Sequence, residues 1–470
     1  MIKVMALSKD IKISHISVLF TLGILFWFLF PVPKELSIQA YHLLIIFVLT
    51  MVGIMFEVIP MCGTLFVSLL ISSLTGTIDL KTNGFSGFMN MVPWLIFFIL
   101  ALSKSITQST IGLRVAYFFM KLFGKNIIGL AYSISVTELT LATILPSNTA
   151  RAASVGFPIV TSLSKYIGTT FKEASRGIGS FLTLVYTSSN ALCSGMFLTA
   201  MISNAIIVDV ADRNGVHLSW LTWVRYIAIP AGIILLVMPI ILYVLLKPQN
   251  VDMNKIRQDA SKKTQELGPF SKEEKIILYA FLGMLFMWIF ADLTHISIMT
   301  TILLGISVFL FLGIFTVKDI LSDYSTLNSV ITIGILISYA NCLGKYGAID
   351  WLNNNVQNFV SIYPENMRLY ALSIIYFFTH YFFSGEGSKI VALNLPFVLT
   401  GVALGIDKLD LIITLAAFSS FSTMLTHYAN PAVIMMFSNG YVTAKKWMGI
   451  GLIISIITMT MWFILRNITL

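Results

Sequence analysis

The chain is poor in charged residues. Only 11% of its 470 residues are Asp, Glu, Lys or Arg, whereas soluble chains carry about a quarter. Hydrophobic residues make up 57%, and the mean hydropathy is +0.88. This composition excludes an ordinary soluble domain and indicates a polytopic membrane protein. The net charge of +9 comes from Lys and Arg placed mainly in loops, as in cytoplasmic loops of membrane proteins, so it does not indicate nucleic-acid binding.

Cysteine is also scarce, and the sequence motifs of common enzymes are absent. Cys62, Cys193 and Cys342 lie in apolar segments without metal-binding spacing, which excludes a disulfide framework and a metal site built on cysteine. The sequence contains no HExxH, GxSxG or Walker-type glycine loop. Residues 384–388, Ser-Gly-Glu-Gly-Ser, superficially suggest a serine hydrolase but have no flanking strand and no ordered His–Asp partner. We therefore expect no enzyme activity, no metal and no cofactor.

One polar stretch interrupts a long apolar region at residues 145–153, Leu-Pro-Ser-Asn-Thr-Ala-Arg-Ala-Ala. Pro146 cannot donate a backbone hydrogen bond and should stop the arriving helix. Ser147, Asn148 and Thr149 are residue types that cap a new helix, here expected near Ala150. Polar backbone at membrane depth persists only where it lines a cavity or is buried in protein. With the guanidinium of Arg151, this tip predicts a site for an anion.

The apolar segments and loop charges predict an all-α membrane protein built from two halves. Residues 1–246 would form the first half, with a hairpin at 127–165 that opens to the inside and a broken helix at 177–210. Residues 247–275 read as a solvated cytoplasmic linker. Residues 276–470 would form the second half, with a hairpin at 369–404 that opens to the outside and a broken helix at 409–440. The N-terminus is expected in the cytoplasm.

The two halves share a pattern. Arg151 precedes Pro158 by seven residues, and Lys389 precedes Pro396 by seven, each cation ending a Ser- or Gly-rich tip. Leu198-Thr199 followed by Asn204 corresponds to Leu425-Thr426 followed by Asn430. Paired discontinuous helices in an inverted repeat indicate the binding site of a secondary transporter near the membrane midplane.

Three motifs carry a resemblance to a known family. They are Pro146-Ser147-Asn148-Thr149-Ala150-Arg151, Met196-Phe197-Leu198-Thr199-Ala200-Met201, and Thr426-His427-Tyr428 with Phe437-Ser438-Asn439-Gly440-Tyr441. The chain resembles the divalent anion/sodium symporter family, in particular its 2-oxoglutarate/malate translocator and citrate:succinate antiporter branch. The resemblance implies about eleven transmembrane helices plus two re-entrant helical hairpins, a homodimer, an elevator-type movement, and di- or tricarboxylate substrates.

The chain departs from the family pattern at the second hairpin and at the second broken helix. The second hairpin has Ser384-Gly385-Glu386-Gly387-Ser388-Lys389 in place of a Ser-Asn-Thr motif. Asn430-Pro431 stands where antiporters of the family usually have a turn rich in Gly and Thr. Both departures weaken any residue-by-residue transfer of the family's substrate preference to this chain.

The cations of the two tips suggest how the substrate's charge is balanced. In sodium-coupled members of the family a sodium ion lies near each tip, whereas here Arg151 and Lys389 would act as fixed countercharge. A charge at the bilayer centre costs at least ~2.5–3.5 kcal/mol, so such residues are usually functional. The site with bound dicarboxylate would then be near neutral, whereas the empty site would carry about two positive charges. The empty transport domain should therefore cross the membrane slowly, which favours exchange without sodium. The alternative is that one cation pairs with Glu386, itself salt-bridged or protonated, and only orders its tip.

Hydroxyl and amide groups at the four breaks are the predicted substrate ligands. We expect Thr199 and Asn204 to face the first tip and Thr426 and Asn430 to face the second. The alternatives are helix capping and hydrogen bonds between helices. His427 could protonate near neutral pH or simply pack. The predicted substrate-binding residues are Ser147, Asn148, Thr149, Thr199, Asn204, Ser384, Gly385, Ser388, Thr426 and Asn430.

The resulting hypothesis is a homodimeric carrier of the cytoplasmic membrane that exchanges C4/C5 dicarboxylates such as 2-oxoglutarate, malate and succinate. The alternative is a sodium-coupled di- or tricarboxylate symporter, in which sodium would be required. A channel fits less well, because two occluding hairpins suit alternating access better than an open pore. Apart from substrate, the lipid bilayer and a second copy of the chain, no partner is expected.

Overall fold

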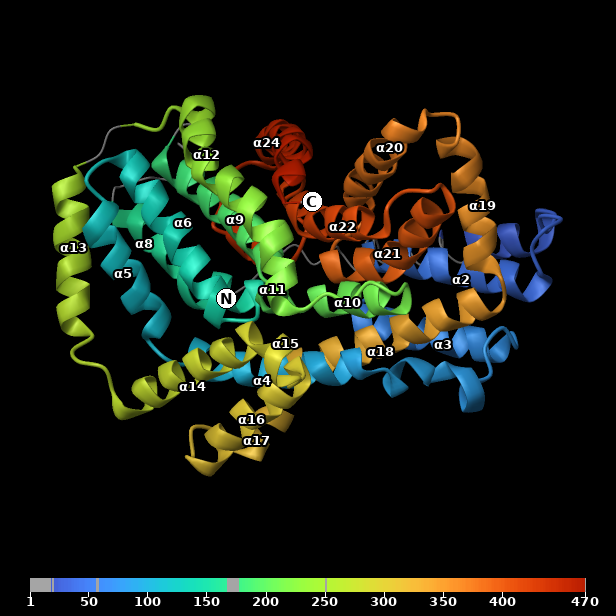
Figure 1. Cartoon of the computed structure of the whole chain (residues 1–470), viewed down its shortest axis with the longest axis horizontal. Coiled ribbons are helices and arrows are strands. Elements are labelled where there is room, and N and C mark those ends of the chain that lie inside the picture. The colour runs from blue at the N-terminus through green and yellow to red at the C-terminus, as the bar shows by residue number, and fades with distance from the viewer. Residues whose placement is uncertain (1–17, 19–20, 56–58, 167–176, 250–251, 470) are drawn as a thin grey trace. The chain divides into compact units, whose positions relative to one another are not determined.

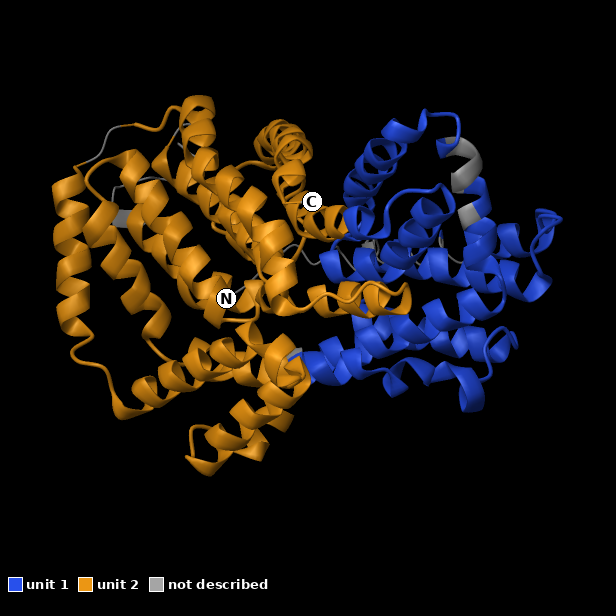
Figure 2. Cartoon of the chain, in the orientation of Figure 1, with its two compact units in different colours: residues 1–97, 324–412 blue, residues 98–323, 413–470 orange. Residues whose placement is uncertain are grey.

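A computed structural model describes residues 18, 21–55, 59–166, 177–249 and 252–469 (Figure 1). Helices make up 81% of the structure, and the described residues contain no strand. The N-terminal residues on which the predicted cytoplasmic terminus depends lie outside these ranges. The chain forms two compact units, 1–97 with 324–412 and 98–323 with 413–470 (Figure 2). Each unit takes segments from both predicted halves, so the units cut across the halves 1–246 and 276–470.

Unit 1 is built from two separate parts of the sequence. Its glycine at position 87 allows the first part to approach the second closely, because an added Cβ would lie 2.0 Å from the carbonyl oxygen of Gly334. Its helices are α2 (Ile38–Met55), α3 (Met61–Leu74), η1 (Leu80–Gly84), η2 (Ser86–Met89), α18 (Tyr324–Lys345), α19 (Ala348–Val360), α20 (Glu365–Phe378), η7 (Thr379–Phe382) and α21 (Glu386–Ala403). Helices α4 (Met91–Thr107) and α22 (Lys408–Phe421) each contribute residues to both units.

Unit 2 contains the first hairpin, the first predicted broken helix, the second one from residue 413 onward, and the linker. Its helices are α5 (Ile111–Phe123), α6 (Ile127–Ile144), α7 (Asn148–Arg151), η3 (Ala152–Gly156), α8 (Phe157–Tyr166), α9 (Ile178–Met196), η5 (Leu198–Ala200), α10 (Asn204–Arg213), α11 (Trp220–Trp223), η6 (Val224–Ala228), α12 (Ile229–Leu246), α13 (Met253–Glu266), α14 (Lys272–Ile289), α15 (Ala291–Thr294), α16 (Ile298–Phe311), α17 (Val317–Leu321), η8 (Ser422–Met424), α23 (Pro431–Phe437), α24 (Ala444–Leu465) and η9 (Arg466–Ile468).

Helix α9 forms the core of unit 2. All 19 of its residues are buried, and α6, α8 and α12 pack around it. Figure 1 shows α5, α6, α9 and α12 side by side. Four successive polar residues, 187–190, lie inside this core, and the Ser189 hydroxyl is 2.8 Å from that of Ser135 on α6. A helix buried on every side needs such internal partners, because no water satisfies its polar groups.

The helix lengths agree in part with a membrane protein. Among the described residues, four helices are long and apolar enough to cross a membrane, and the bent pair formed by 80–89 and 91–107 counts as a fifth. The four are Ile127–Ile144, Trp220–Leu246, Thr326–Lys345 and Ala444–Ile468. Several shorter apolar helices accompany them. The count of eleven spans and the inverted repeat therefore stay predictions.

The predicted linker contains a helix, α13, which packs against α5. Arg114 of α5 holds the segment that follows α13: its guanidinium donates to the carbonyl oxygens of Gly268 at 2.6 Å and Leu267 at 2.9 Å. It also forms an ion pair with Glu274 at 3.2 Å. Lys263 of α13 donates to the hydroxyl of Ser162 on α8 at 2.8 Å. The linker is thus attached both to α5 and to an arm of the first hairpin.

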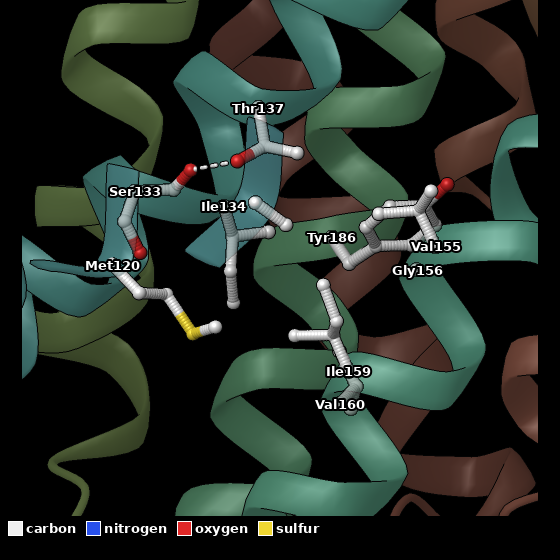
Figure 3. A pocket seen from close by; sticks show the side chains of 10 residues that line it. Met120, Ser133, Ile134, Thr137, Val155, Gly156, Ile159, Val160 and Tyr186 are labelled. Atoms are coloured by element: carbon white, nitrogen blue, oxygen red, sulfur yellow. Dashed lines mark hydrogen bonds between the residues drawn. The ribbon is translucent and has the colours of Figure 1, made fainter. Parts of the chain in front are cut away.

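The second arm of the first hairpin packs closely on α9 through a glycine. An added Cβ at Gly156 would lie 2.1 Å from Cζ of Tyr186, a buried ring of α9. Figure 3 shows both residues beside a cavity between α5, α6, α8 and α9. The cavity has a volume of about 10 Å³, room for about one water molecule. The hairpin therefore lies directly against α9, and only a residue without a side chain fits at position 156.

Replacing this glycine should loosen the hairpin. We expect Gly156→Ala to lower the midpoint of thermal unfolding in detergent, because displacing a buried ring costs about 1–3 kcal/mol. Gly232→Ala on α12 is the matched control, since its Cβ would meet nothing within 4 Å. Fluorescence-detected size-exclusion chromatography after heating measures both. Equal midpoints for the two variants would contradict this packing.

Candidate functional site

The first tip, residues 145–151, joins two helices at a sharp break. Helix α6 ends at Ile144, and α7 begins at Asn148, two residues before the helix start expected from the sequence. The Ser147 hydroxyl caps α7 by accepting a hydrogen bond from the backbone N–H of Ala150 at 3.2 Å. Asn148 is 5% exposed, and Thr149 is half-buried. The local order thus follows from a proline that ends one helix and a serine that starts the next.

Arg151 connects the first tip to the rest of unit 2. Its side chain is fully buried, and Nη1 donates to the carbonyl oxygens of Leu145 at 2.7 Å and Ala200 at 2.8 Å. Nη2 donates to the Ser194 hydroxyl at 2.9 Å. The last carbonyl groups of a helix have no partner within the helix. One guanidinium therefore satisfies carbonyl groups at two different helix breaks and holds these breaks together.

The carboxylate that balances Arg151 is Glu138 of α6. Oε1 of Glu138 accepts from Nε of Arg151 at 2.6 Å, and both side chains are at most 1% exposed. This differs from the predicted role of Arg151 as uncompensated countercharge, because the pair is neutral. From the sequence we expected only Glu386 as a carboxylate partner of a tip cation, and Glu138 was missed. A signal existed: Glu138 is the single charged residue between positions 127 and 150.

The first broken helix is closed by two of the predicted substrate-binding side chains, those of Thr199 and Asn204. Helix α9 ends at Met196, and Asn204 donates through Nδ2 to the carbonyl oxygens of Ser194 at 3.0 Å and Phe197 at 3.1 Å. The Thr199 hydroxyl accepts from the indole N–H of Trp220 at 3.2 Å. Thr199 and Asn204 thus form hydrogen bonds within the protein, which is the alternative to substrate binding given above.

The second broken helix lies next to the first hairpin. Asn430 caps α23, because its Oδ1 accepts from the backbone N–H of Val433 at 2.8 Å. Helix α23 packs against α7 and η3, a neighbour that the sequence analysis did not predict for Asn430. The Thr426 hydroxyl is buried without a hydrogen-bond partner in the described structure. The His427 ring packs against that of Phe437, with 4.4 Å between centroids.

The second tip, residues 383–389, belongs to unit 1. Helix α21 begins at Glu386 after Gly385, and the Ser388 hydroxyl donates to the carbonyl oxygen of Gly385 at 2.8 Å. Ser384 and Gly385 are half-buried. Lys389 is fully buried, and its Nζ lies 4.2 Å from the centroid of the Tyr376 ring, a cation–π contact. Glu386 lies one helical turn before Lys389 and is 6% exposed.

The predicted residues thus fall into two groups. Unit 2 brings together the first tip and both broken helices, with Ser147, Asn148, Thr149, Arg151, Thr199, Asn204, Thr426, His427 and Asn430. Unit 1 holds the second tip, with Ser384, Gly385, Glu386, Ser388 and Lys389. The described residues contain no group of three or more His, Cys, Asp or Glu side chains able to hold a metal ion.

Known proteins resemble the chain over nearly its whole length. It is 33% identical to the putative malate transporter YflS of Bacillus subtilis, over 98% of both chains. It is 31% identical to the chloroplastic dicarboxylate transporter 1 of Spinacia oleracea, covering 94% of this chain and 78% of that protein. It is 29% identical to the citrate/succinate antiporter of Escherichia coli K12, over 97% of both.

A solved structure shares the fold. MtrF of Neisseria gonorrhoeae, reported as illuminating a class of antimetabolite efflux pumps, matches with a TM-score of 0.56 at 11% identity, covering 97% of this chain and 94% of MtrF. The family model described as the sodium:sulfate symporter transmembrane region matches residues 11–469. The chain is therefore a multi-pass membrane transporter that belongs to the divalent anion/sodium symporter family.

Proposed function

We propose that this transporter exchanges C4/C5 dicarboxylates, such as malate, succinate and 2-oxoglutarate, across the cytoplasmic membrane without sodium. The observation that carries the proposal is the fully buried cation of the second tip, Lys389. A cation that is part of the chain crosses with the carrier in every cycle, whereas sodium must be bound anew. The names of the relatives, two dicarboxylate or malate transporters and one antiporter, support the same substrate class and mode.

The substrate would bind where polar groups occur at helix breaks. At the first tip the candidate donors are the Asn148 amide and the hydroxyls of Ser147 and Thr149. The Ser147 hydroxyl accepts a hydrogen bond where it caps α7, so its O–H can still donate. At the second tip the candidates are Ser384, Ser388 and the first backbone N–H groups of α21, which the helix dipole makes favourable for an anion. Each tip thus offers hydrogen-bond donors for a carboxylate.

The charges assign different roles to the two cations. Arg151 is neutralised by Glu138, so we propose that it mainly orders the first tip. Lys389 then provides the fixed countercharge, moderated by Glu386 one turn away. The carrier would move its binding site as an elevator within a homodimer, with the N-terminus and the linker in the cytoplasm.

A sodium-coupled symporter is the second candidate, and the Arg151–Glu138 pair favours it. Because the pair is neutral, one of the two net positive charges expected from the sequence is lost. A dianion would then need another positive charge, which a bound sodium ion could supply. The coupling ion is therefore the property that separates the two candidates.

Arg151 should be required for its geometry and not only for its charge. We expect Arg151→Lys to reduce transport at least about tenfold, because an ammonium group cannot reach Glu138 and two carbonyl groups in one plane. We expect Arg151→Gln to lower thermal stability by about 3–5 kcal/mol, because Glu138 then remains as an unpaired buried charge. Uptake into proteoliposomes and thermal unfolding in detergent measure the two effects. Wild-type transport by Arg151→Lys would contradict this role.

Exchange should be visible in reconstituted liposomes. In sodium-free buffer we expect labelled succinate to enter liposomes preloaded with malate, and not empty liposomes, because the empty carrier returns slowly. Adding external sodium should leave the rate unchanged. Protein-free liposomes with the same internal malate are the control.

Two outcomes would contradict exchange. Uptake into empty liposomes that stops when choline replaces sodium would establish the symporter. The absence of uptake for every dicarboxylate, with the protein folded, would exclude the proposed substrate class.

A further inference from the structure

We propose that Glu138 sets the charge of the substrate that the first tip accepts: by neutralising Arg151 it makes the site favour dianions over trianions. The inference rests on the proposed function as a carboxylate transporter, but not on the choice between exchange and sodium coupling. It assigns a specificity role to a residue that does not itself have to contact the substrate. We therefore describe Glu138 as a positioning residue.

The geometry places Glu138 directly behind the first tip. Its Oε1 accepts from Nε of Arg151 at 2.6 Å and from Nδ2 of Asn190 at 2.7 Å. The same Nδ2 lies 3.3 Å from the carbonyl oxygen of Asn148, the residue that begins α7. Oε2 of Glu138 is buried without a hydrogen-bond partner in the described structure. The carboxylate is thus connected to the tip backbone through one amide and to the tip cation by an ion pair.

No other formal charge lies in the helices that pack against α7, which are α6, η3, α9 and α23. Within 127–164, which contains the first hairpin, the charged residues are Glu138 and Arg151. Residues 178–208, which contain α9 and the first break, have none. Residues 413–444, which contain the second break, have His427 as their single titratable side chain apart from Tyr and Cys. The net charge of the first tip and of the helices in contact with α7 is therefore determined by the Glu138–Arg151 pair.

A charge inside a protein acts over several ångströms because little water screens it. At an effective dielectric constant of about 20 and a separation of about 8–10 Å, one unit of charge changes the affinity for each substrate charge by about tenfold or more. A neutral tip would not favour a third negative charge, whereas a tip of charge +1 would. Dicarboxylates and citrate differ by this one charge when both are fully ionised.

The test is Glu138→Gln, which keeps the shape and an oxygen acceptor for Arg151 and Asn190 but removes the negative charge. The measured quantity is the ratio of citrate to succinate affinity, obtained from competition with labelled succinate at a pH where citrate is a trianion. We expect this ratio to rise about tenfold in Glu138→Gln. Glu138→Asp, which keeps the charge, should leave the ratio near the wild-type value.

The matched control is Glu274→Gln. Among the described residues of unit 2, Glu274 forms the other Arg–Glu pair, with Arg114 at 3.2 Å and with side chains 8% and 11% exposed, on the linker side of α5. It has the same chemistry but holds the linker, so its substitution should not change the citrate to succinate ratio. If Glu274→Gln raised the citrate to succinate ratio by a similar factor, the loss of any carboxylate in unit 2 would have the same effect, and the proposal would be overturned.

A second variant shifts the charge in the opposite direction. Ser194→Asp places a second carboxylate beside Arg151, whose Nη2 now donates to the Ser194 hydroxyl at 2.9 Å, and should lower the citrate to succinate ratio. This variant keeps the proposal testable if Glu138→Gln does not fold. Folding of each variant is checked by size-exclusion chromatography, and ligand-induced thermal stabilisation provides a binding readout without transport.

The outcomes are distinguishable. A citrate to succinate ratio that rises in Glu138→Gln or falls in Ser194→Asp supports the proposal. Folded variants that lose succinate and citrate affinity equally would overturn it, because Glu138 would then have only a structural role. A wild-type protein that neither binds nor carries any carboxylate would instead refute the proposed function, and this inference with it.

Discussion

The arrangement of unit 2 depends on the hydrogen bonds of one buried guanidinium. A helix that stops inside a membrane protein leaves carbonyl groups without water to satisfy them, and each unsatisfied group costs about 1–3 kcal/mol. Arg151 reaches a carbonyl group at the first tip and another at the first broken helix, and Glu138 balances its charge. Two interruptions that would each destabilise the fold are thereby joined. The discontinuous helices persist because their ends satisfy one another.

The same constraint explains the surroundings of the breaks. Asn204 and Trp223 satisfy carbonyl groups at the end of α9, the indole of Trp223 donating to that of Gly195 at 2.8 Å. Gly451 lets α24 approach the second break, since a Cβ there would lie 2.5 Å from the carbonyl oxygen of Met424. Helix α9, buried along its whole length, supports these contacts. These contacts hold the first tip, whose Asn148 and Thr149 side chains we propose as substrate ligands.

Much of this could be predicted from local sequence, and the rest required contacts distant in sequence. Pro146 and Ser147 have strong local preferences, so the break was predicted to within two residues, and the motifs identified the family. The partner of Arg151 was missed because Glu138 lies 13 residues away and is brought near only when α6 and α7 fold back. Asn204 was assigned to substrate because an amide near a break suits both roles. Sequence alone could not show that it closes the helix end.

The compact units illustrate the same limit. Hydropathy divides the chain into halves along the sequence, whereas each unit combines segments from both halves. Which helices pack together is decided by side-chain fit, such as Gly156 against Tyr186, and hydropathy does not encode this fit. The two buried cations were found from sequence because charge in an apolar region is conspicuous. Their different environments, a carboxylate for Arg151 and an aromatic ring for Lys389, depend on packing.

The central claim is that Arg151 holds the first tip and the first broken helix together. The most direct measurement is the distance between spin labels at Thr143 and Ile202, both half-buried, in a background without the three native cysteines. Double electron–electron resonance would compare this distance in the protein that keeps Arg151 and in the Arg151→Gln variant. The account predicts one narrow distance distribution with Arg151 and a broader or displaced one without it. Identical narrow distributions in both proteins would contradict it.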